Sequence, residues 1–153
     1  MAQSAGLRLA LRSRGDLPNP DTEIYIADTL GELGLFYRVA PIVFMGGSLV
    51  QHGGQNPIEP AKLGAAILHG PHVWNFEELY AALDDAHGAE LVDSAEKLTA
   101  AFAAMLAQPQ VRTRLAHAGR NAVSALGGAL ERTMQALEPY LSKVQKRRDD
   151  AHA

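Results

Sequence analysis

The residues best suited to chemistry lie in short segments that combine glycines with a helix-capping residue and a carboxylate. In one of them, Asn56, Pro57 and Glu59 follow two glycine pairs at positions 46–47 and 53–54. Asparagine at the N-cap, proline at the first helical position and a carboxylate at the third are typical of a helix start. The N–H groups of such a start can bind an anion, and upstream glycines let a phosphate approach the backbone. A carboxylate at Glu59 can accept hydrogen bonds from both vicinal hydroxyls of a ribose.

A second segment, Thr29-Leu30-Gly31-Glu32, has the same character. Thr29 and Glu32 have the S/T-x-x-E spacing of a capping box. Gly31 would fall in the first helical turn, where glycine costs about 1 kcal/mol relative to alanine, so its presence there indicates the close approach of a ligand. Helix capping without any ligand is a complete explanation of both segments, and both interpretations stay open at this point.

Signatures of other chemistries are absent from the sequence. It has no G-x-S-x-G, Walker A or G-x-G-x-x-G motif, and no carboxylate pair stands out as acid and base. There is no cysteine and no H-x-x-x-H or H-E-x-x-H spacing among the six histidines, so we expect no metal site. His69 lies in an apolar run and is interpreted as a core residue with satisfied hydrogen bonds, whereas His72 is a candidate for lining a cleft.

The composition narrows the possible partners. The chain has 153 residues, of which 47% are apolar and 20% charged, with a net charge of −3 from 14 basic and 17 acidic residues. These proportions are ordinary for a globular domain and provide no global basic field for nucleic acid or an anionic membrane. No apolar run approaches the roughly 18 residues of a membrane span, and a chain without cysteine fits a reducing compartment.

Short apolar runs alternate with segments of helical spacing, and these elements must position the candidate residues. We expect strands at Leu7–Leu11, Glu23–Ala27, Ile42–Met45, Ala66–His69 and Ala89–Val92. We expect helices at Leu30–Val39, Pro57–Leu63, Phe76–Ala86 and Ala95–Leu106, and a helical region from Gln110 to a break at Gly127-Gly128. This alternation predicts an α/β fold with a mostly parallel sheet that is covered on both faces. Gly64 and Gly88 are predicted to end helices and Asn75 to cap one, and residues 143–153 are expected to form a charged, frayed tail.

Three glycine-rich junctions follow the predicted strands and should lie at their carboxyl ends, where open α/β sheets bind ligands. The residues expected to line such a cleft are Gly46, Gly47, Ser48, Gly53, Gly54 and His72.

Four runs, in this order, closely resemble bacterial 3-deoxy-D-manno-octulosonic acid (Kdo) transferases. They are IADTLGEL at Ile26–Leu33, VFMGGSLV at Val43–Val50, GGQNPIEP at Gly53–Pro60, and Gly70-Pro71-His72 with Asn75-Phe76. The resemblance extends from near Met1 to about Tyr140. It implies that residues 1–142 are part of the C-terminal, CMP-sugar-binding half of a GT-B glycosyltransferase, in which each half is Rossmann-like. The implied activity is transfer of Kdo from CMP-Kdo to the lipid A precursor during lipopolysaccharide synthesis at the cytoplasmic face of the bacterial inner membrane.

The resemblance also implies where the donor binds. The implied CMP contacts are Leu30, Gly31, Glu32, Asn56, Pro57, Ile58 and Glu59. Leu30 stands where methionine is frequent in the family, and Gln55 stands where histidine is common. CMP-Kdo is the expected donor substrate, with no cofactor. The general base, the acceptor domain with its membrane-associated start and a Pro-Arg pair for CMP are expected in an N-terminal part that is absent from this sequence, so no catalytic residue is assigned here.

Other functions remain compatible with these residues. One is a different GT-B nucleotide-sugar transferase, since ribose-binding glutamates recur at this place in that fold. Another is a stand-alone nucleotide-binding module, or a truncated product without activity. We expect the isolated chain to be inactive, poorly stable and cytoplasmic, with contact to the lipid A precursor and the membrane only through the missing part.

Overall fold

The computed structural model describes residues 6–127, 136–138 and 140. The chain divides into two compact units, Met1–Phe36 and Tyr37–Ala153, each built around parallel strands. The predicted fold class, α/β with parallel strands and flanking helices, is confirmed. The described part of the chain contains no helix that is both long and apolar enough to cross a membrane.

The first unit contains two short strands that pair in parallel. Strand β1 (Leu9–Leu11) lies beside β2 (Ile24–Ile26), with Leu9 opposite Ile24, and the short helix η2 (Arg12–Arg14) follows β1. Helix α1 (Leu33–Val39) begins three residues later than predicted. The rings of Tyr25 and Phe36 pack at 6.1 Å between centroids and form part of the apolar contact of this unit.

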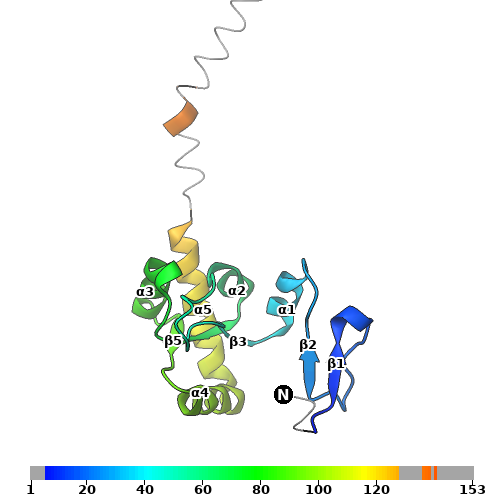
Figure 1. The fold of residues 1–153 in the computed structure, drawn as a ribbon. Coiled ribbons are helices and arrows are strands. Elements are labelled where there is room, and N and C mark those ends of the chain that lie inside the picture. The colour runs from blue at the N-terminus through cyan, green and yellow to red at the C-terminus, as the bar shows by residue number, and fades with distance from the viewer. Residues whose placement is uncertain (1–5, 128–135, 139, 141–153) are drawn as a thin grey trace, which may run out of the picture. The chain divides into compact units, whose positions relative to one another are not determined.

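The second unit has a three-stranded parallel sheet in the order β3-β4-β5, formed by Ile42–Phe44, Ala66–His69 and Ala89–Leu91. Its helices are α2 (Ile58–Leu63), the short η3 (Trp74–Phe76), α3 (Glu77–Asp85), α4 (Ala95–Ala107) and α5 (Pro109–Leu126). In this unit α3 and α4 lie on opposite sides of the strands (Figure 1). Strands and helices therefore alternate as predicted, with most bounds within one or two residues.

The central strand β4 is buried along its whole length because helices cover both faces of the sheet. Leu68 points to one face and packs with Val92 and Met105, whereas Ile67 points to the other and packs with Leu83 and Tyr80. Neighbouring residues of a strand face opposite sides, so one apolar run supplies both cores. This explains why the run did not alternate with polar residues.

The helix ends agree with the prediction at Gly64 and differ from it at Gly88 and Asn75. Gly64 ends α2 in a left-handed conformation, as predicted. At the end of α3 the left-handed residue is His87 (φ 53°) rather than Gly88, whose N–H bonds to the carbonyl of Leu83. Asn75 does not cap α3, because that helix begins at Glu77 and the Asn75 amide donates to the carbonyl of His52 at 3.4 Å.

Helix α5 (Pro109–Leu126) begins one residue before the predicted start and ends at the predicted break. Pro109 stands in its first turn, where a missing N–H is harmless, and the helix ends at Leu126, directly before Gly127. The remainder of the predicted break, at Gly128, and the predicted tail at residues 143–153 lie outside the described residues.

Candidate functional site

The predicted helix start at Asn56 exists, and its cap is made as expected. The Asn56 side-chain oxygen accepts the N–H of Ile58 at 3.0 Å. The regular helix is assigned from Ile58, one residue later than predicted, and Pro57 has a helical conformation just before it. Helix bounds commonly differ by one residue between definitions, so Asn56 is the capping residue in the chemical sense.

The N–H groups at this helix start are nearly all engaged or missing. Pro57 and Pro60 carry no N–H, and the N–H of Ile58 is donated to Asn56. Only the N–H of Glu59 is left over in this turn, because the N–H of Ala61 bonds to the carbonyl of Pro57. A helix start with one free donor is a poor phosphate cradle, so the ribose interpretation is better supported than the anion interpretation.

The Glu59 side chain is available for a ligand. It is exposed and makes no hydrogen bond or ion pair with another described residue. Burial, and secondly the negative charge of Glu59, raise the pKa of the nearby Tyr37. A carboxylate held at a fixed helix position can accept hydrogen bonds from two hydroxyl groups of a sugar.

Two tyrosines that the sequence analysis did not single out stand behind this segment. Tyr80 is 1% exposed, and its hydroxyl donates to the carbonyl of Gln55 at 2.7 Å. Burial is the main reason that the pKa of Tyr80 is raised, with Tyr37 as the next cause. Because Gln55 directly precedes the capping residue Asn56, this bond holds the entry to α2 in place. Neither tyrosine belongs to a motif, so no local signal marks them.

His69 is a satisfied core residue, as predicted. It is 2% exposed, its Nδ1 lies 2.8 Å from the carbonyl oxygen of Gly70 and its Nε2 lies 3.0 Å from the Asp84 carboxylate. Each ring nitrogen therefore lies within hydrogen-bond distance of an acceptor oxygen. The ring also packs on Tyr80 at 4.5 Å, which links it to the residues that hold Gln55.

Most of the glycines in the predicted cleft face protein atoms. A Cβ at Gly53 would overlap the Asn75 side chain, and one at Gly54 would lie 3.3 Å from the Cα of Val73. A Cβ at Gly47 would lie 2.7 Å from the ring of His52, whereas one at Gly46 would meet nothing within 4 Å. Segment 73–75 of the protein itself thus occupies the space at Gly53 and Gly54 that the sequence analysis reserved for a ligand. Gly46 is the glycine of this group that borders open space.

Ser48 is an interior residue, which corrects its assignment to the cleft surface. It is fully buried, its hydroxyl donates to the carbonyl of Met45 at 2.5 Å and it accepts the N–H of Gly70 at 2.8 Å. Ser48 therefore ties together the carboxyl ends of β3 and β4. His72 is half-buried beside it: its N–H donates to the Ser48 carbonyl at 2.9 Å, and its ring lies edge-on to the exposed Trp74.

In the first unit, the capping role predicted for Glu32 is not observed, whereas its contact with CMP stays a prediction. Glu32 precedes α1 instead of standing inside a capping box, and Arg12 donates to both of its carboxylate oxygens, from Nε at 3.0 Å and Nη2 at 2.6 Å. The Thr29 hydroxyl donates to the same carboxylate at 2.5 Å. These bonds, from Arg12 first and Thr29 second, lower the pKa of Glu32 to about 2.

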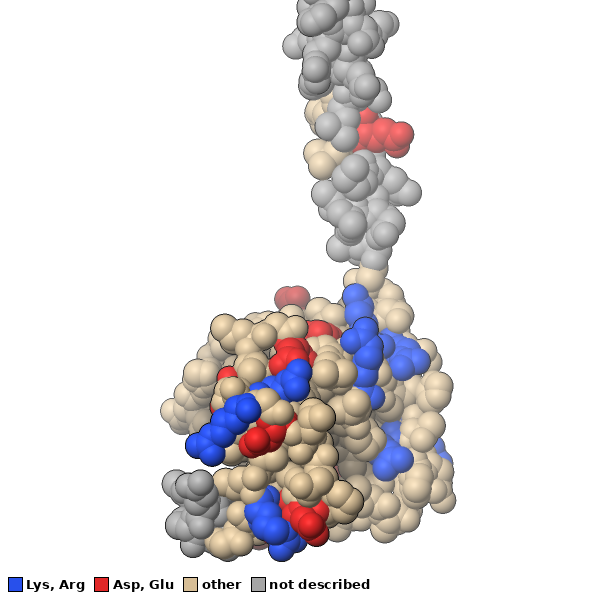
Figure 2. Space-filling model, turned by 90° about the vertical axis from the view of Figure 1, so that its right-hand side faces the viewer, with Lys and Arg blue, Asp and Glu red and all other residues tan. Residues whose placement is uncertain are grey.

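The surroundings of Glu32 extend this network. Ser13, in the short helix after β1, donates to the Asp28 carboxylate from its N–H at 2.8 Å and from its hydroxyl at 2.6 Å. These bonds lower the pKa of Asp28. Figure 2 shows acidic and basic side chains interspersed on one face of the molecule. Gly31 has a left-handed φ of 84° with open space around it, and Leu30 is fully exposed. Gly31 thus lies in a turn that precedes α1, and not in the first turn of the helix as predicted.

Among the described residues, no group of three histidine, aspartate or glutamate side chains could hold a metal ion. The second unit is a Rossmann-like α/β unit, because its strands are parallel, helices cover them and a capped helix start follows β3. Units of this class bind ligands at the carboxyl ends of their strands.

Comparisons with known proteins point to one kind of enzyme. The 3-deoxy-D-manno-octulosonic acid transferase of Haemophilus influenzae is 39% identical over 133 residues, 86% of this chain and 31% of that protein. The protein of the same name from Bordetella pertussis is 37% identical over 142 residues, 91% of this chain and 33% of that protein. The chain thus spans about a third of the length of these curated relatives, and no protein-family model matches it.

A solved structure shares the fold. The C-terminal CMP-Kdo binding domain of WaaA from Acinetobacter baumannii aligns with a TM-score of 0.77 and 29% identity, over 80% of this chain and 64% of that one. These comparisons confirm the resemblance: the chain is homologous to the C-terminal part of Kdo transferases.

Proposed function

We propose that this chain forms part of the CMP-Kdo-binding domain of a transferase that moves Kdo onto the lipid A precursor. The observation that carries the proposal is the helix start at Asn56–Glu59, placed after β3 with a free carboxylate. The similarity to the CMP-Kdo binding domain of WaaA supports the choice of donor.

Glu59 is the residue to which we assign the ribose of CMP. Its carboxylate accepts hydrogen bonds from the two vicinal hydroxyls. The helix start is kept in position by the bond between Asn56 and Ile58 and by the bond from Tyr80 to Gln55. With one free N–H in this turn, the phosphate needs donors from outside the α2 start. Trp74 and His72, which border Gly53 and Gly54, are further candidates for contact with the donor.

In the first unit, we assign contact with CMP to the backbone at Gly31, which has open space around it. The Glu32 carboxylate already receives bonds from Arg12 and Thr29, so we propose that it shapes this loop and contributes to binding through its position. The proton-accepting base and the acceptor site are proposed to belong to parts of the transferase that this chain does not contain.

The test is CMP binding by the chain, followed by calorimetry or amide NMR. Glu59→Gln should weaken CMP binding by roughly ten- to a hundredfold, since hydrogen bonds to a charged group contribute about 1.5–3 kcal/mol. Glu90→Gln is the matched control, because Glu90 is also exposed but lies on β5. Equal CMP affinity of both variants would contradict the assignment of Glu59. Tighter binding of UDP than of CMP would favour a different nucleotide-sugar transferase.

A further inference from the structure

A pocket in the Tyr37–Ala153 unit lies away from the carboxyl ends of the strands. It is lined by α5 and by residues just before two strands, Pro41 before β3 and Gly64 before β4, and its volume is about 130 Å³. Since the strands are parallel, these residues mark the amino ends of the sheet, whereas Asn56 and Ser48 follow the carboxyl end of β3. One water needs roughly 10–15 Å³ by this measure, so the pocket admits a group of several heavy atoms.

The pocket is positively charged without internal compensation. Arg112, His117 and Arg120 line it, and none of the described residues around it carries a carboxylate. Helix α5 contains no aspartate or glutamate over its 18 residues, although the whole chain carries a net charge of −3. Neither the Arg112 side chain nor the Arg120 side chain forms an ion pair or hydrogen bond with another described residue. These two guanidinium groups therefore have their full set of donors available.

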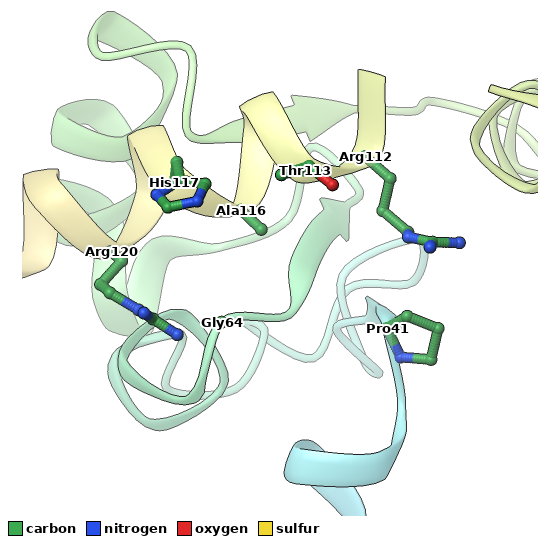
Figure 3. Close-up of a pocket in the computed structure, with 7 residues that line it drawn as sticks. All are labelled: Pro41, Gly64, Arg112, Thr113, Ala116, His117 and Arg120. Atoms are coloured by element: carbon green, nitrogen blue, oxygen red, sulfur yellow. The ribbon is translucent and has the colours of Figure 1, made fainter. Parts of the chain in front are cut away.

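The shape of the pocket follows from the spacing on α5. Arg112, Ala116 and Arg120 are each four residues apart and share one face of the helix. Ala116 is 9% exposed and too short to fill the space between the two arginines. Figure 3 shows Arg112 extending toward Pro41 and Arg120 toward Gly64, so the arginines flank the hollow that the Ala116 side chain faces. Their side chains have no ion pair to break when they turn toward a group bound between them.

The donors in this pocket suit a phosphate group. The Thr113 hydroxyl already donates to the carbonyl of Pro109 at 2.9 Å, so the available charged donors are the guanidiniums. Guanidinium presents paired N–H groups whose geometry matches a phosphate. We propose that Arg112 and Arg120 bind a phosphate group in this pocket. The same chemistry is offered by free phosphate and by the phosphate of a lipid headgroup, and this site is independent of the proposed CMP contacts.

The experiment adds inorganic phosphate to the full chain and follows the amide NMR signals of α5. We expect saturable shifts in α5 that weaken at least roughly tenfold in Arg112→Gln/Arg120→Gln, because both charge-assisted donor groups are lost. Arg114→Gln removes an exposed arginine of the same helix that does not line the pocket, and it should bind within about twofold of the unmodified chain. Thr113→Glu leaves both arginines in place and should also abolish the shifts, since it adds a carboxylate at the pocket.

A second arm uses phosphatidylcholine vesicles with and without phosphatidic acid. Binding that requires phosphatidic acid and is lost in the double variant identifies a lipid phosphate as an occupant, even where free phosphate binds too weakly to saturate. Saturable binding of free phosphate alone identifies a soluble source. The proposal is overturned if neither probe binds, or if the double variant and Thr113→Glu bind as well as the unmodified chain while thermal unfolding shows that all are folded.

Discussion

Gly88 and Gly119 lie backbone against backbone, and neither position has room for a side chain. A Cβ at Gly88 would be 2.5 Å from the Cα of Gly119, and one at Gly119 would be 2.6 Å from the carbonyl oxygen of Gly88. Gly88 directly precedes β5 and Gly119 lies in α5, so the pair sets how closely this helix approaches the sheet. Helix α5 also packs against α2, α3 and β4, which makes this distance important for the whole unit.

Replacing Gly119 by alanine should therefore destabilise the protein. The added methyl group meets backbone on the opposite side, which no change of rotamer can relieve, and we expect a loss of about 1–3 kcal/mol in the free energy of unfolding. Urea unfolding of the chain measures it. Gly46→Ala is the control, since its Cβ would meet nothing within 4 Å, and its effect should stay within about 0.5 kcal/mol. Equal unfolding midpoints for the two variants would argue against the contact.

The ion pair between Arg12 and Glu32 predicts a pH dependence of the first unit. Hydrogen bonds from Arg12, and secondly from Thr29, lower the pKa of Glu32 from 4.5 to about 2. A carboxyl group with a depressed folded-state pKa stabilises the folded state above its unfolded pKa, and this contribution is lost as pH falls through the folded pKa. The contribution of Glu32 should thus be complete above pH 4.5 and disappear as the pH falls toward about 2.

An NMR titration of the Glu32 carboxyl checks this directly. Arg12→Gln should raise the pKa of Glu32 toward its ordinary value, because it removes the largest cause of the shift. Arg14→Gln, in the same short helix, should leave the titration of Glu32 unchanged, since Arg14 acts on Asp28. A Glu32 carboxyl that titrates near 4.5 in the unmodified chain would contradict the ion pair.

Asp84→Ala should destabilise the second unit by leaving His69 without one partner. The His69 ring is buried, and an unsatisfied buried donor costs about 1–3 kcal/mol. Asp85→Ala is a matched control, since both residues are acidic side chains at the end of α3 and share the same helix-dipole effect. Chemical denaturation should separate the two variants clearly. Identical stabilities would mean that the bond from His69 to Asp84 contributes nothing.

Tyr80→Phe tests whether the entry to α2 depends on α3. The change removes only the hydroxyl that donates to the Gln55 carbonyl, and we expect a loss of about 0.5–1.5 kcal/mol in stability. Under the proposed function, CMP binding should weaken as well, because Gln55 precedes the capping residue Asn56. Lower stability with unchanged CMP affinity would limit Tyr80 to a role in the fold.

The elements of the fold could be predicted from the sequence because their signals are local. Apolar runs set the strands, and Gly64, Pro109 and Gly127 mark helix ends through backbone preferences that act within a few residues. The same local rules placed Asn56 as a capping residue. They gave errors at Gly88 and Asn75, where the backbone conformation is decided by packing against α5 and by the segment that contains His52.

The sequence by itself determined the alternation of strands and helices, the core position of His69 and the resemblance to Kdo transferases. Only the tertiary structure decided which side chains meet. Glu32 binds Arg12 twenty residues upstream, Ser48 is buried between β3 and β4, and α5 creates the pocket that contains Arg112 and Arg120. The physical reason is distance along the chain: these contacts join separate elements, and their geometry arises only when close packing sets the spacing between a helix and the sheet.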